Sequence, residues 1–334
     1  MHLRIHHLSS HTSASTSPMP FRSPALLLPF LFFALFGVVA GVYPDVDYKD
    51  ITVGDRVIGR LYKPKTCQPD QKLPFLFFVH GGAFILFSPF MKDYDNYTSA
   101  ATKKSNIIVF SIDYRYYIPK AYDDSWETFK WVASHRSGSG PEPWLNTHVD
   151  FDKVYLAGDS AGANICHNIL MRLVGGGGPE ESKADGVDIK VQGLAMLHPY
   201  FWGSKPVGTE PTDAKGRSWA VGIWLAAIKA SPPESSEVDE MLDDVRDNPL
   251  LDPKLGSLPV EKLLVIYGDE DVLKDRGQAY VKALEEKGWP GKAKVMSSHG
   301  THCFFLAEFD KDPEKMRVFD RFNSFISGEW PIQD

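Results

Sequence analysis

The feature that most constrains this chain is a series of continuous apolar runs that alternate with amphipathic stretches. Runs that are apolar throughout, and not at every second residue, lie at 73–80, 106–114, 154–160, 191–200 and 262–271. Such runs are typical of strands buried on both faces, as in a parallel sheet. The stretches that indicate helices are 121–135, 161–174, 275–288 and 313–326. This alternation predicts an α/β protein with a mostly parallel central sheet and helices on both faces.

Three segments depart from this rhythm. Residues 51–65 alternate in polarity, which predicts an antiparallel hairpin at the edge of the sheet. The glycine-rich segment 175–186 indicates a surface loop. Residues 201–253 form a long insertion with a helical core at 218–229, and they lie between two predicted strands. Because ligands bind at the carboxyl ends of strands in such sheets, we expect the insertion to form a helical lid or cap; the alternative is a helix remote from any site.

The first 42 residues differ from the rest of the chain. Residues 1–42 contain no Asp or Glu, and residues 25–42 carry no charge. We interpret them as an apolar targeting or anchor segment, which implies the secretory pathway or a membrane association through 25–42. The alternatives are a plastid transit peptide and a cytoplasmic enzyme whose apolar segment packs on the fold. The sequon Asn96-Tyr97-Thr98 fits secretion, and residues 43–334 are expected to form the main domain.

Charge and cysteine content exclude two classes of function. The net charge is −7 and no run of Lys and Arg occurs, so nucleic acid is not expected as a partner. Cys67, Cys166 and Cys303 are far apart and lack the spacing of a metal site. We therefore expect no cysteine-based zinc site.

A Gly-x-Ser-x-Gly pattern occupies residues 158–162, with Ser160 at its centre. It falls between a predicted strand, VYLAGD, and a predicted helix, AGANICHNIL. A serine at such a strand-to-helix turn presents its hydroxyl above the sheet, and the N–H of the next residue, Ala161, lies at the helix N-terminus. The context predicts that Ser160 is a nucleophile.

A second motif ends the strand 73–80. His80-Gly81-Gly82-Ala83 brings a glycine pair to the end of a central strand, where backbone N–H groups can point at a substrate oxygen. We predict an oxyanion hole from His80, Gly81, Gly82, Ala83 and Ala161, with the N–H groups of 81–83 and of Ala161 as donors. His80 is interpreted as a structural residue of this loop and not as a base.

A serine nucleophile needs a histidine and a carboxylate, which follow it in the order serine, acid, histidine. Acidic residues after the strand 262–271 are Asp269, Glu270, Asp271 and Asp275. We predict Asp271, because Asp269 and Glu270 suit the turn and Asp275 suits a helix cap. The histidines that follow are His299 and His302. We predict His302, with His299 as the alternative.

These motifs, together with IDYR at 112–115, LHPYFWG at 197–203 and the late GTHCFF, resemble the plant carboxylesterases of the hormone-sensitive-lipase-like branch of the α/β-hydrolase superfamily. The resemblance covers about residues 45–328. It implies the α/β-hydrolase fold, a serine hydrolase acting on small to medium carboxylic esters, and a triad of Ser160, Asp271 and His302. It also implies that no metal or organic cofactor is needed. One departure is Ala83, where the family usually has a third glycine.

Other functions occur on the same scaffold. Related gibberellin receptors resemble this fold but lack the catalytic histidine and only bind a small molecule, and His302 argues against that function here. Dehydratases and cyclases reuse the triad for eliminations, and acyltransferases replace water with an alcohol. The resemblance therefore favours an ester hydrolase and leaves a lyase or an acyltransferase open.

Overall fold

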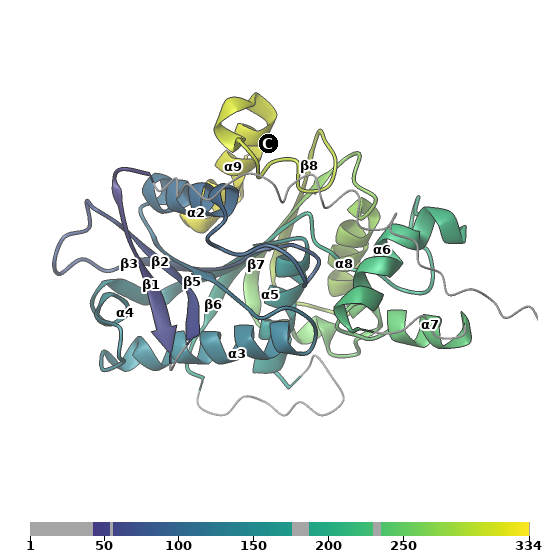
Figure 1. Ribbon diagram of the computed structural model, residues 1–334, viewed down its shortest axis with the longest axis horizontal. Helices are drawn as coiled ribbons and strands as arrows, with labels where there is room; N and C mark the ends of the chain where they lie inside the picture. The colour runs from purple at the N-terminus through teal and green to yellow at the C-terminus, as the bar shows by residue number, and fades with distance from the viewer. Residues whose placement is uncertain (1–42, 54–55, 176–186, 230–234, 334) are drawn as a thin grey trace, which may run out of the picture. The chain divides into compact units, whose positions relative to one another are not determined.

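The computed structural model describes residues 43–53, 56–175, 187–229 and 235–333. In this part of the chain one sheet of eight strands has the order β1-β2-β4-β3-β5-β6-β7-β8 (Figure 1). The strands are β1 (Val46–Val53), β2 (Arg56–Pro64), β3 (Leu73–Val79), β4 (Ile108–Ile112), β5 (Val149–Asp159), β6 (Val191–Leu197), β7 (Val260–Gly268) and β8 (Lys292–Ser298). β1 and β2 pair antiparallel, as predicted for 51–65, and β2 pairs antiparallel with β4. All other pairs are parallel.

Helices cover both faces of the sheet. The helices of the described part of the chain are α2 (Lys92–Ser105), α3 (Lys120–Ala133), α4 (Pro143–His148), α5 (Ala161–Leu173), α6 (Ala214–Ala227), α7 (Ser235–Leu242), α8 (Lys274–Glu286) and α9 (Pro313–Ile326). Figure 1 shows α2 and α9 on one side of the sheet and α3 on the other. The four helices predicted at 121–135, 161–174, 275–288 and 313–326 are confirmed to within two residues at each end.

The central strand β3 shows why its run is apolar throughout. It lies between β4 and β5 and pairs in parallel with both. The ring of Phe77 packs against Phe129 of α3 at 5.7 Å between centroids, whereas the next ring, Phe78, packs against Phe322 of α9 at 6.5 Å. Successive side chains point to opposite faces, and both faces are covered. A strand in this position is therefore mostly apolar, and its parallel pairing between two covered faces confirms the predicted fold class.

Helix α2 was not predicted from the sequence. Its buried face contains Tyr94, Tyr97, Ala100 and Ala101, but also polar residues such as Asp95. The buried Asp95 accepts hydrogen bonds from the Tyr62 hydroxyl at 2.6 Å and from Arg60 at 3.1 Å. Because half of the buried face is polar, the helical hydropathy pattern is weak. The sequon at 96–98 falls in this helix, where Asn96 is half-buried and Tyr97 and Thr98 are buried.

The segment predicted as a lid leaves the sheet after β6 and returns at β7, and it contains α6 and α7. Helix α6 begins four residues before the predicted helical core, because the Asp213 side chain caps it by accepting from the Gly216 N–H at 3.0 Å. A buried ion pair fixes the segment to the sheet domain. Arg276 of α8 binds Glu210 at 2.6 Å, and its guanidinium also donates to the carbonyl of Lys205 at 2.6 Å.

The predicted targeting or anchor segment, residues 1–42, lies outside the described residues, as does most of the predicted loop 175–186. Within the described ranges, no helix has the length and apolar character needed to cross a membrane. The interpretation of residues 25–42 therefore stays a prediction.

Candidate active site

Ser160 lies at the turn between β5 and α5, with φ 51° and ψ −119°. A non-glycine residue in this region of backbone space is strained, and such strain is concentrated at functional sites. The flanking glycines allow the turn to approach β3. A Cβ on Gly162 would lie 2.0 Å from the carbonyl oxygen of Val79, and one on Gly158 would lie 2.7 Å from the same atom. With no side chain at either position, the Ser160 hydroxyl is held at the carboxyl end of the sheet.

The structure brings the three predicted residues together. Ser160 Oγ is 2.8 Å from His302 Nε2, and His302 Nδ1 is 2.7 Å from Asp271 Oδ2. They come from the ends of β5, β7 and β8, which lie far apart in the sequence and meet at one edge of the sheet. The other carboxylate oxygen, Asp271 Oδ1, accepts from the N–H of Leu273 at 2.9 Å. The arrangement can relay a proton from the hydroxyl to the imidazole.

The rejected candidates have other contacts. Asp269 is exposed and lies 3.1 Å from Nδ1 of His299, also exposed. Asp275 accepts from the N–H and hydroxyl of Thr209 at 2.7 and 2.6 Å, at the start of α8. The alternative histidine, His299, therefore faces a different carboxylate from His302. Glu270 is exposed as well.

Asp271 and His302 each shift the pKa of the other in the direction that favours its charged form. Burial alone would raise the pKa of Asp271, but His302 and His198 outweigh it and hold this pKa well below its usual range. Burial alone would lower the pKa of His302, but the Asp271 carboxylate outweighs it and raises the pKa above 6.5. Asp271 is therefore charged at neutral pH, and it stabilises the protonated form of His302.

The oxyanion-hole prediction needs one correction. The N–H of Gly81 donates to Asp159 Oδ1 at 2.9 Å and to the Tyr94 hydroxyl at 3.0 Å, so it does not point at a substrate. Among the described residues, the N–H groups of Gly82, Ala83 and Ala161 have no hydrogen-bond partner in the protein. The backbone turns sharply here, with φ 105° at Gly82 and 55° at Ala83. Ala83 adopts a conformation that suits glycine better.

Asp159 anchors this loop, a role that the sequence analysis missed. It is buried directly before Ser160 and also accepts from the Tyr94 hydroxyl at 2.8 Å. Burial raises its pKa to about 6, although the hydrogen bonds from Tyr94 and Gly81 oppose the shift. A Cβ on Gly81 would lie 2.4 Å from Asp159 Oδ2, which explains the glycine at this position.

His80 has the structural role that the sequence indicates. Its ring is fully buried and stacks on Tyr114 at 4.2 Å between centroids. The Tyr114 hydroxyl donates to the carbonyls of His80 and Gly81, at 2.9 and 3.0 Å. Burial lowers the His80 pKa to about 4, so the ring is neutral at neutral pH.

A second histidine contacts the same carboxylate as His302 and was also missed. His198 follows β6 and is buried, with Nδ1 3.2 Å from Asp271 Oδ2. Burial lowers its pKa, although Asp271 opposes the shift. Its position at the carboxyl end of the strand beside β7, in the motif LHPYFWG, is a signal that could have identified it.

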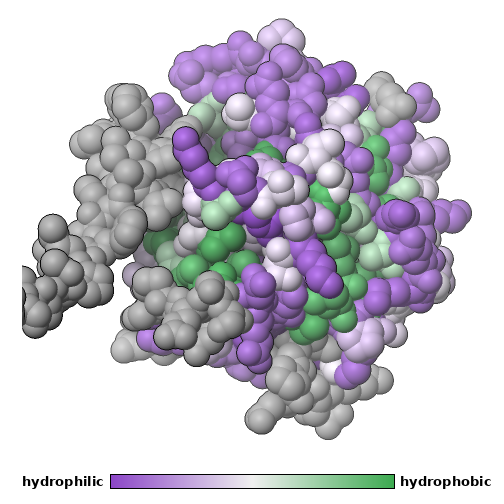
Figure 2. Space-filling view, turned by 90° about the vertical axis from the view of Figure 1, so that its right-hand side faces the viewer, coloured by the Kyte–Doolittle hydropathy of each residue, from purple (hydrophilic) through white to green (hydrophobic). Residues whose placement is uncertain are grey.

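The segment after β6 reaches the site. The ring of Trp219 in α6 lies 5.5 Å from the His302 ring, at an angle of 73°. Trp224 of the same helix packs on Phe84, which follows the oxyanion loop, at 6.0 Å. Figure 2 views the side of the molecule that carries α6 and α7, where hydrophobic side chains show in hollows between hydrophilic ones. These contacts are what a cap over a ligand crevice requires.

Several aromatic residues in the loops that follow β3 and β6 belong to the core. Phe201 stacks on Tyr280 at 5.0 Å, and Trp202 is fully buried. Phe84 is also fully buried. Phe87, in the loop that follows β3, is partly exposed.

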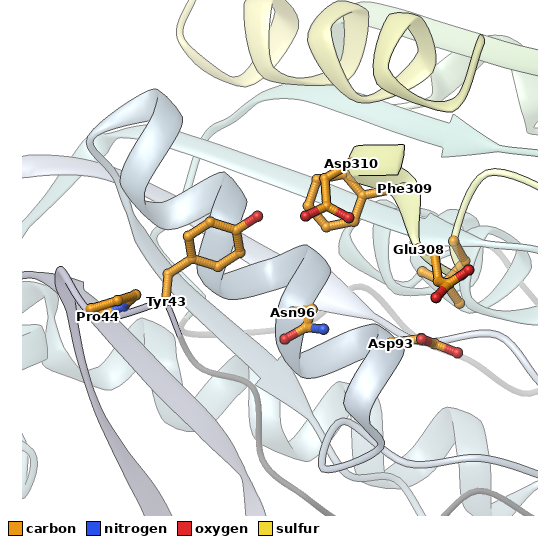
Figure 3. A pocket seen from close by; sticks show the side chains of 8 residues that line it. Tyr43, Pro44, Asp93, Asn96, Glu308, Phe309 and Asp310 are labelled. Atoms are coloured by element: carbon orange, nitrogen blue, oxygen red, sulfur yellow. The ribbon is translucent and has the colours of Figure 1, made fainter. Parts of the chain in front are cut away.

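A separate hollow lies beside the loop that follows His302. It has a volume of about 250 Å³. Figure 3 shows its lining, with the carboxylates of Asp93, Glu308 and Asp310 near Tyr43, Asn96 and Phe309. No triad residue lines it. Glu308 is already paired with Lys311 at 2.5 Å.

Two groups of side chains in the described part of the chain have the donor atoms that a metal ion would use. One is His198, Asp271 and His302, and the other is the exposed set of Asp269, Glu270 and His299. In the first group, His302 already hydrogen-bonds to Asp271 through Nδ1 and to Ser160 through Nε2. The hydrogen-bonding atoms of these side chains are therefore already used within a proton relay.

A hydroxyl, an imidazole and a carboxylate in series at the carboxyl edge of a mostly parallel sheet define the class, an α/β hydrolase. The sequence pattern of the family described as "alpha/beta hydrolase fold" matches residues 76–306. An arylesterase structure superposes with a TM-score of 0.64 at 19% identity, covering 88% of this chain and 87% of that one. At this identity it supports the fold alone.

Plant relatives are more similar in sequence. Probable carboxylesterase 5 of Arabidopsis thaliana is 36% identical over 77% of this chain and 78% of its own length. The 2-hydroxyisoflavanone dehydratase of Glycine max is 36% identical over 84% and 87%. Tuliposide A-converting enzyme 1, chloroplastic, of Tulipa gesneriana is 33% identical over 95% and 84%. The chain belongs to the plant carboxylesterase family of α/β hydrolases, and its enzyme class is that of the carboxylic ester hydrolases.

Proposed function

We propose that this protein hydrolyses small to medium carboxylic esters through an acyl-enzyme on Ser160. His302 removes the hydroxyl proton as Oγ attacks the ester carbonyl, and Asp271 orients the imidazole and stabilises its charged form. His302 then protonates the leaving alcohol. Water repeats the sequence on the acyl-enzyme and releases the acid. The observation that carries this proposal is the unbroken series of hydrogen bonds from Ser160 to Asp271, at 2.8 and 2.7 Å.

The tetrahedral intermediate also needs donors for its oxyanion. We assign the N–H groups of Gly82, Ala83 and Ala161, because they have no hydrogen-bond partner within the described chain. Ala161 directly follows Ser160, and the loop of Gly82 and Ala83 is bound through Gly81 to Asp159, the residue before Ser160. A donor of this kind contributes about 2.7–4 kcal/mol to transition-state stabilisation. The assignment leaves His80 and Gly81 with a positioning role in the same loop.

Labelling and turnover test the proposal together. The purified protein should hydrolyse p-nitrophenyl acetate or butyrate and react covalently with a fluorophosphonate probe, and Ser160→Ala should abolish both. Ser218→Ala is the matched control, because Ser218 is an exposed serine that caps no helix and donates only to the Lys215 carbonyl. Labelling of the Ser160→Ala variant at the wild-type rate would reject the nucleophile assignment.

An elimination is the second candidate. The dehydratase of Glycine max is as similar in identity as the carboxylesterase and aligns over more of this chain. The same imidazole could remove a carbon-bound proton without an acyl-enzyme. Incubation with 2-hydroxyisoflavanone, followed by mass spectrometry, distinguishes the two: loss of water without fluorophosphonate sensitivity of Ser160 would favour the lyase. An acyltransferase would instead be recognised by ester products when an alcohol is added.

We infer a plastid as the alternative to secretion for the intact chain. A match over 95% of the chain to a relative named chloroplastic extends into the segment before Tyr43. That segment is free of acidic residues. A fusion of the full chain to a C-terminal fluorescent protein should label chloroplasts in leaf cells, whereas label in the secretory pathway would favour the signal or anchor interpretation.

A further inference from the structure

His198 is a buried neutral histidine aimed at the triad carboxylate. Its Nδ1 lies 3.2 Å from Asp271 Oδ2, the same oxygen that His302 contacts at 2.7 Å. The backbone at His198 has φ 48°, and its N–H donates to the carbonyl of Ile266 in β7 at 2.7 Å. This hydrogen bond fixes the backbone of His198 to β7, the strand that leads to Asp271.

The same nitrogen faces a second group. The backbone N–H of Cys303 lies 3.2 Å from His198 Nδ1. Nδ1 can serve only one of them, because it donates to the carboxylate when protonated and accepts from Cys303 when it is not. The position of the ring proton decides which hydrogen bond forms.

Two features favour the proton on Nδ1. A bare Nδ1 would direct its lone pair at a buried anion, whereas Nδ1–H makes a charge-assisted hydrogen bond, the stronger kind. The other nitrogen, Nε2, is buried without a hydrogen-bond partner among the described residues. A proton there would be an unpaired buried donor.

We propose that His198 is a positioning residue that donates its Nδ1–H to Asp271 and so sets both the orientation and the basicity of the triad carboxylate. This inference rests on the proposed function. A second donor on Oδ2 competes with His302 for the same oxygen, which makes the carboxylate a weaker partner for the imidazolium. His198 therefore lowers the pKa of His302 relative to a triad that lacks it, and it extends activity to lower pH.

The charged and titratable groups around this relay are few. His302 is faced by Asp271, His198 and Asp159, and the Cys303 thiol of the same loop lies 3.8 Å from Asp159 Oδ2. His198 is faced by Asp271 and His302. Burial, together with Asp159 and Asp271, raises the pKa of the Cys303 thiol, so it stays neutral in the range where His302 titrates. Asp159, whose pKa burial raises to about 6, titrates in this range in the wild type and the variant alike, and none of the described contacts of His198 reaches it. The difference in the acid limb between the two proteins therefore reports on Asp271 and His302.

The test uses two substitutions and a spectrum. His198→Phe removes the donor, and His198→Asn offers an amide N–H near the place of Nδ1–H. We expect the acid limb of kcat/KM in His198→Phe to move up by about half a pH unit. We expect its kcat to fall about tenfold at unchanged KM, as for one lost hydrogen bond to a charged group. His198→Asn should restore both.

NMR of the wild-type protein labelled with ¹⁵N-histidine tests the same proposal without catalysis. The ring proton of His198 should reside on Nδ1, and the downfield proton of His302 Nδ1–H should shift in His198→Phe. A proton on Nε2 of His198, or an acid limb unmoved in a folded His198→Phe variant, would overturn the proposal. Failure of the proposed function would appear differently, as esterase activity and probe labelling that survive in Ser160→Ala.

Discussion

Two His–Asp pairs connect the same two loops, which follow β7 and β8, and only one of them contacts Ser160. His302 and Asp271 are 2.7 Å apart, with side chains 22% and 1% exposed. His299 and Asp269 are 3.1 Å apart, with side chains 75% and 50% exposed. The histidines are three residues apart in the sequence and the aspartates two.

The comparison shows that a shifted pKa does not by itself identify a base. In both pairs the carboxylate raises the pKa of its histidine. The pairs differ in what lies on the other side of the ring. His302 has the Ser160 hydroxyl 2.8 Å from Nε2, whereas the described contacts of His299 lead to Asp269 and, through its backbone N–H, to Glu314. Burial also keeps water from competing for the Asp271–His302 bond.

The largest difference in kcat is expected between substitutions of the two histidines. His302→Ala should lower kcat for p-nitrophenyl butyrate by about 10⁶-fold, the loss typical of removing the base of a serine hydrolase. His299→Ala should keep wild-type activity. Initial rates of the two purified variants, with circular dichroism to verify folding, make the comparison. Equal losses would show that the exposed pair takes part in catalysis.

Substitutions of the two aspartates should differ in kcat by less than those of the two histidines. Asp271→Asn keeps the shape of the side chain but favours the wrong tautomer of His302, so kcat should fall about 10⁴-fold. Asp269→Asn should leave kcat unchanged. A mild effect of Asp271→Asn would mean that another group orients His302, and the assignment of the acid would then be wrong.

A substitution in the oxyanion loop at Gly81 should lower the rate less than the triad substitutions do, because Gly81 positions the loop and does not itself donate to the substrate. Gly81→Ala places a Cβ 2.4 Å from Asp159 Oδ2 and should displace the N–H groups of Gly82 and Ala83. We expect kcat/KM to fall about 10²-fold, the lower range for loss of an oxyanion donor. Gly138→Ala is the control, since its positive φ adds strain but its Cβ would meet no atom within 4 Å. Equal losses in both variants would point to general strain.

The sequence predicted the fold, and it predicted the three side chains that the structure brings together, because each depends on a pattern. Strands such as β3 are buried on both faces and must be apolar throughout, and the order of serine, acid and histidine restricts the search to a few positions. Helix α2 was not predicted from the sequence because its buried face carries Asp95. This carboxylate accepts hydrogen bonds from Tyr62 and Arg60 of β2, a strand that is distant in the sequence. No local pattern records such partners.

The residues near Ser160 that the sequence did not indicate were missed for the same reason: no local pattern records the partners that folding brings close. Asp159 contacts Gly81, and His198, for which we propose a positioning role, contacts Asp271; only folding creates these contacts. The same reason explains the error at Gly81. A glycine pair after a strand predicts close approach to a ligand, but the first of the two N–H groups is used by Asp159.

The smallest effect expected is a difference in the response to salt. Because His302 must be neutral to act as a base and its pKa is raised above 6.5, kcat/KM should fall as the pH drops through that raised pKa. Salt at about 1 M shortens the Debye length to about 3 Å and screens exposed pairs far more than buried ones. The acid limb set by His302 should therefore hardly move, whereas NMR titration should show the pKa of His299 falling back toward 6.5. If salt moved both by the same amount, burial would not be what separates the two pairs.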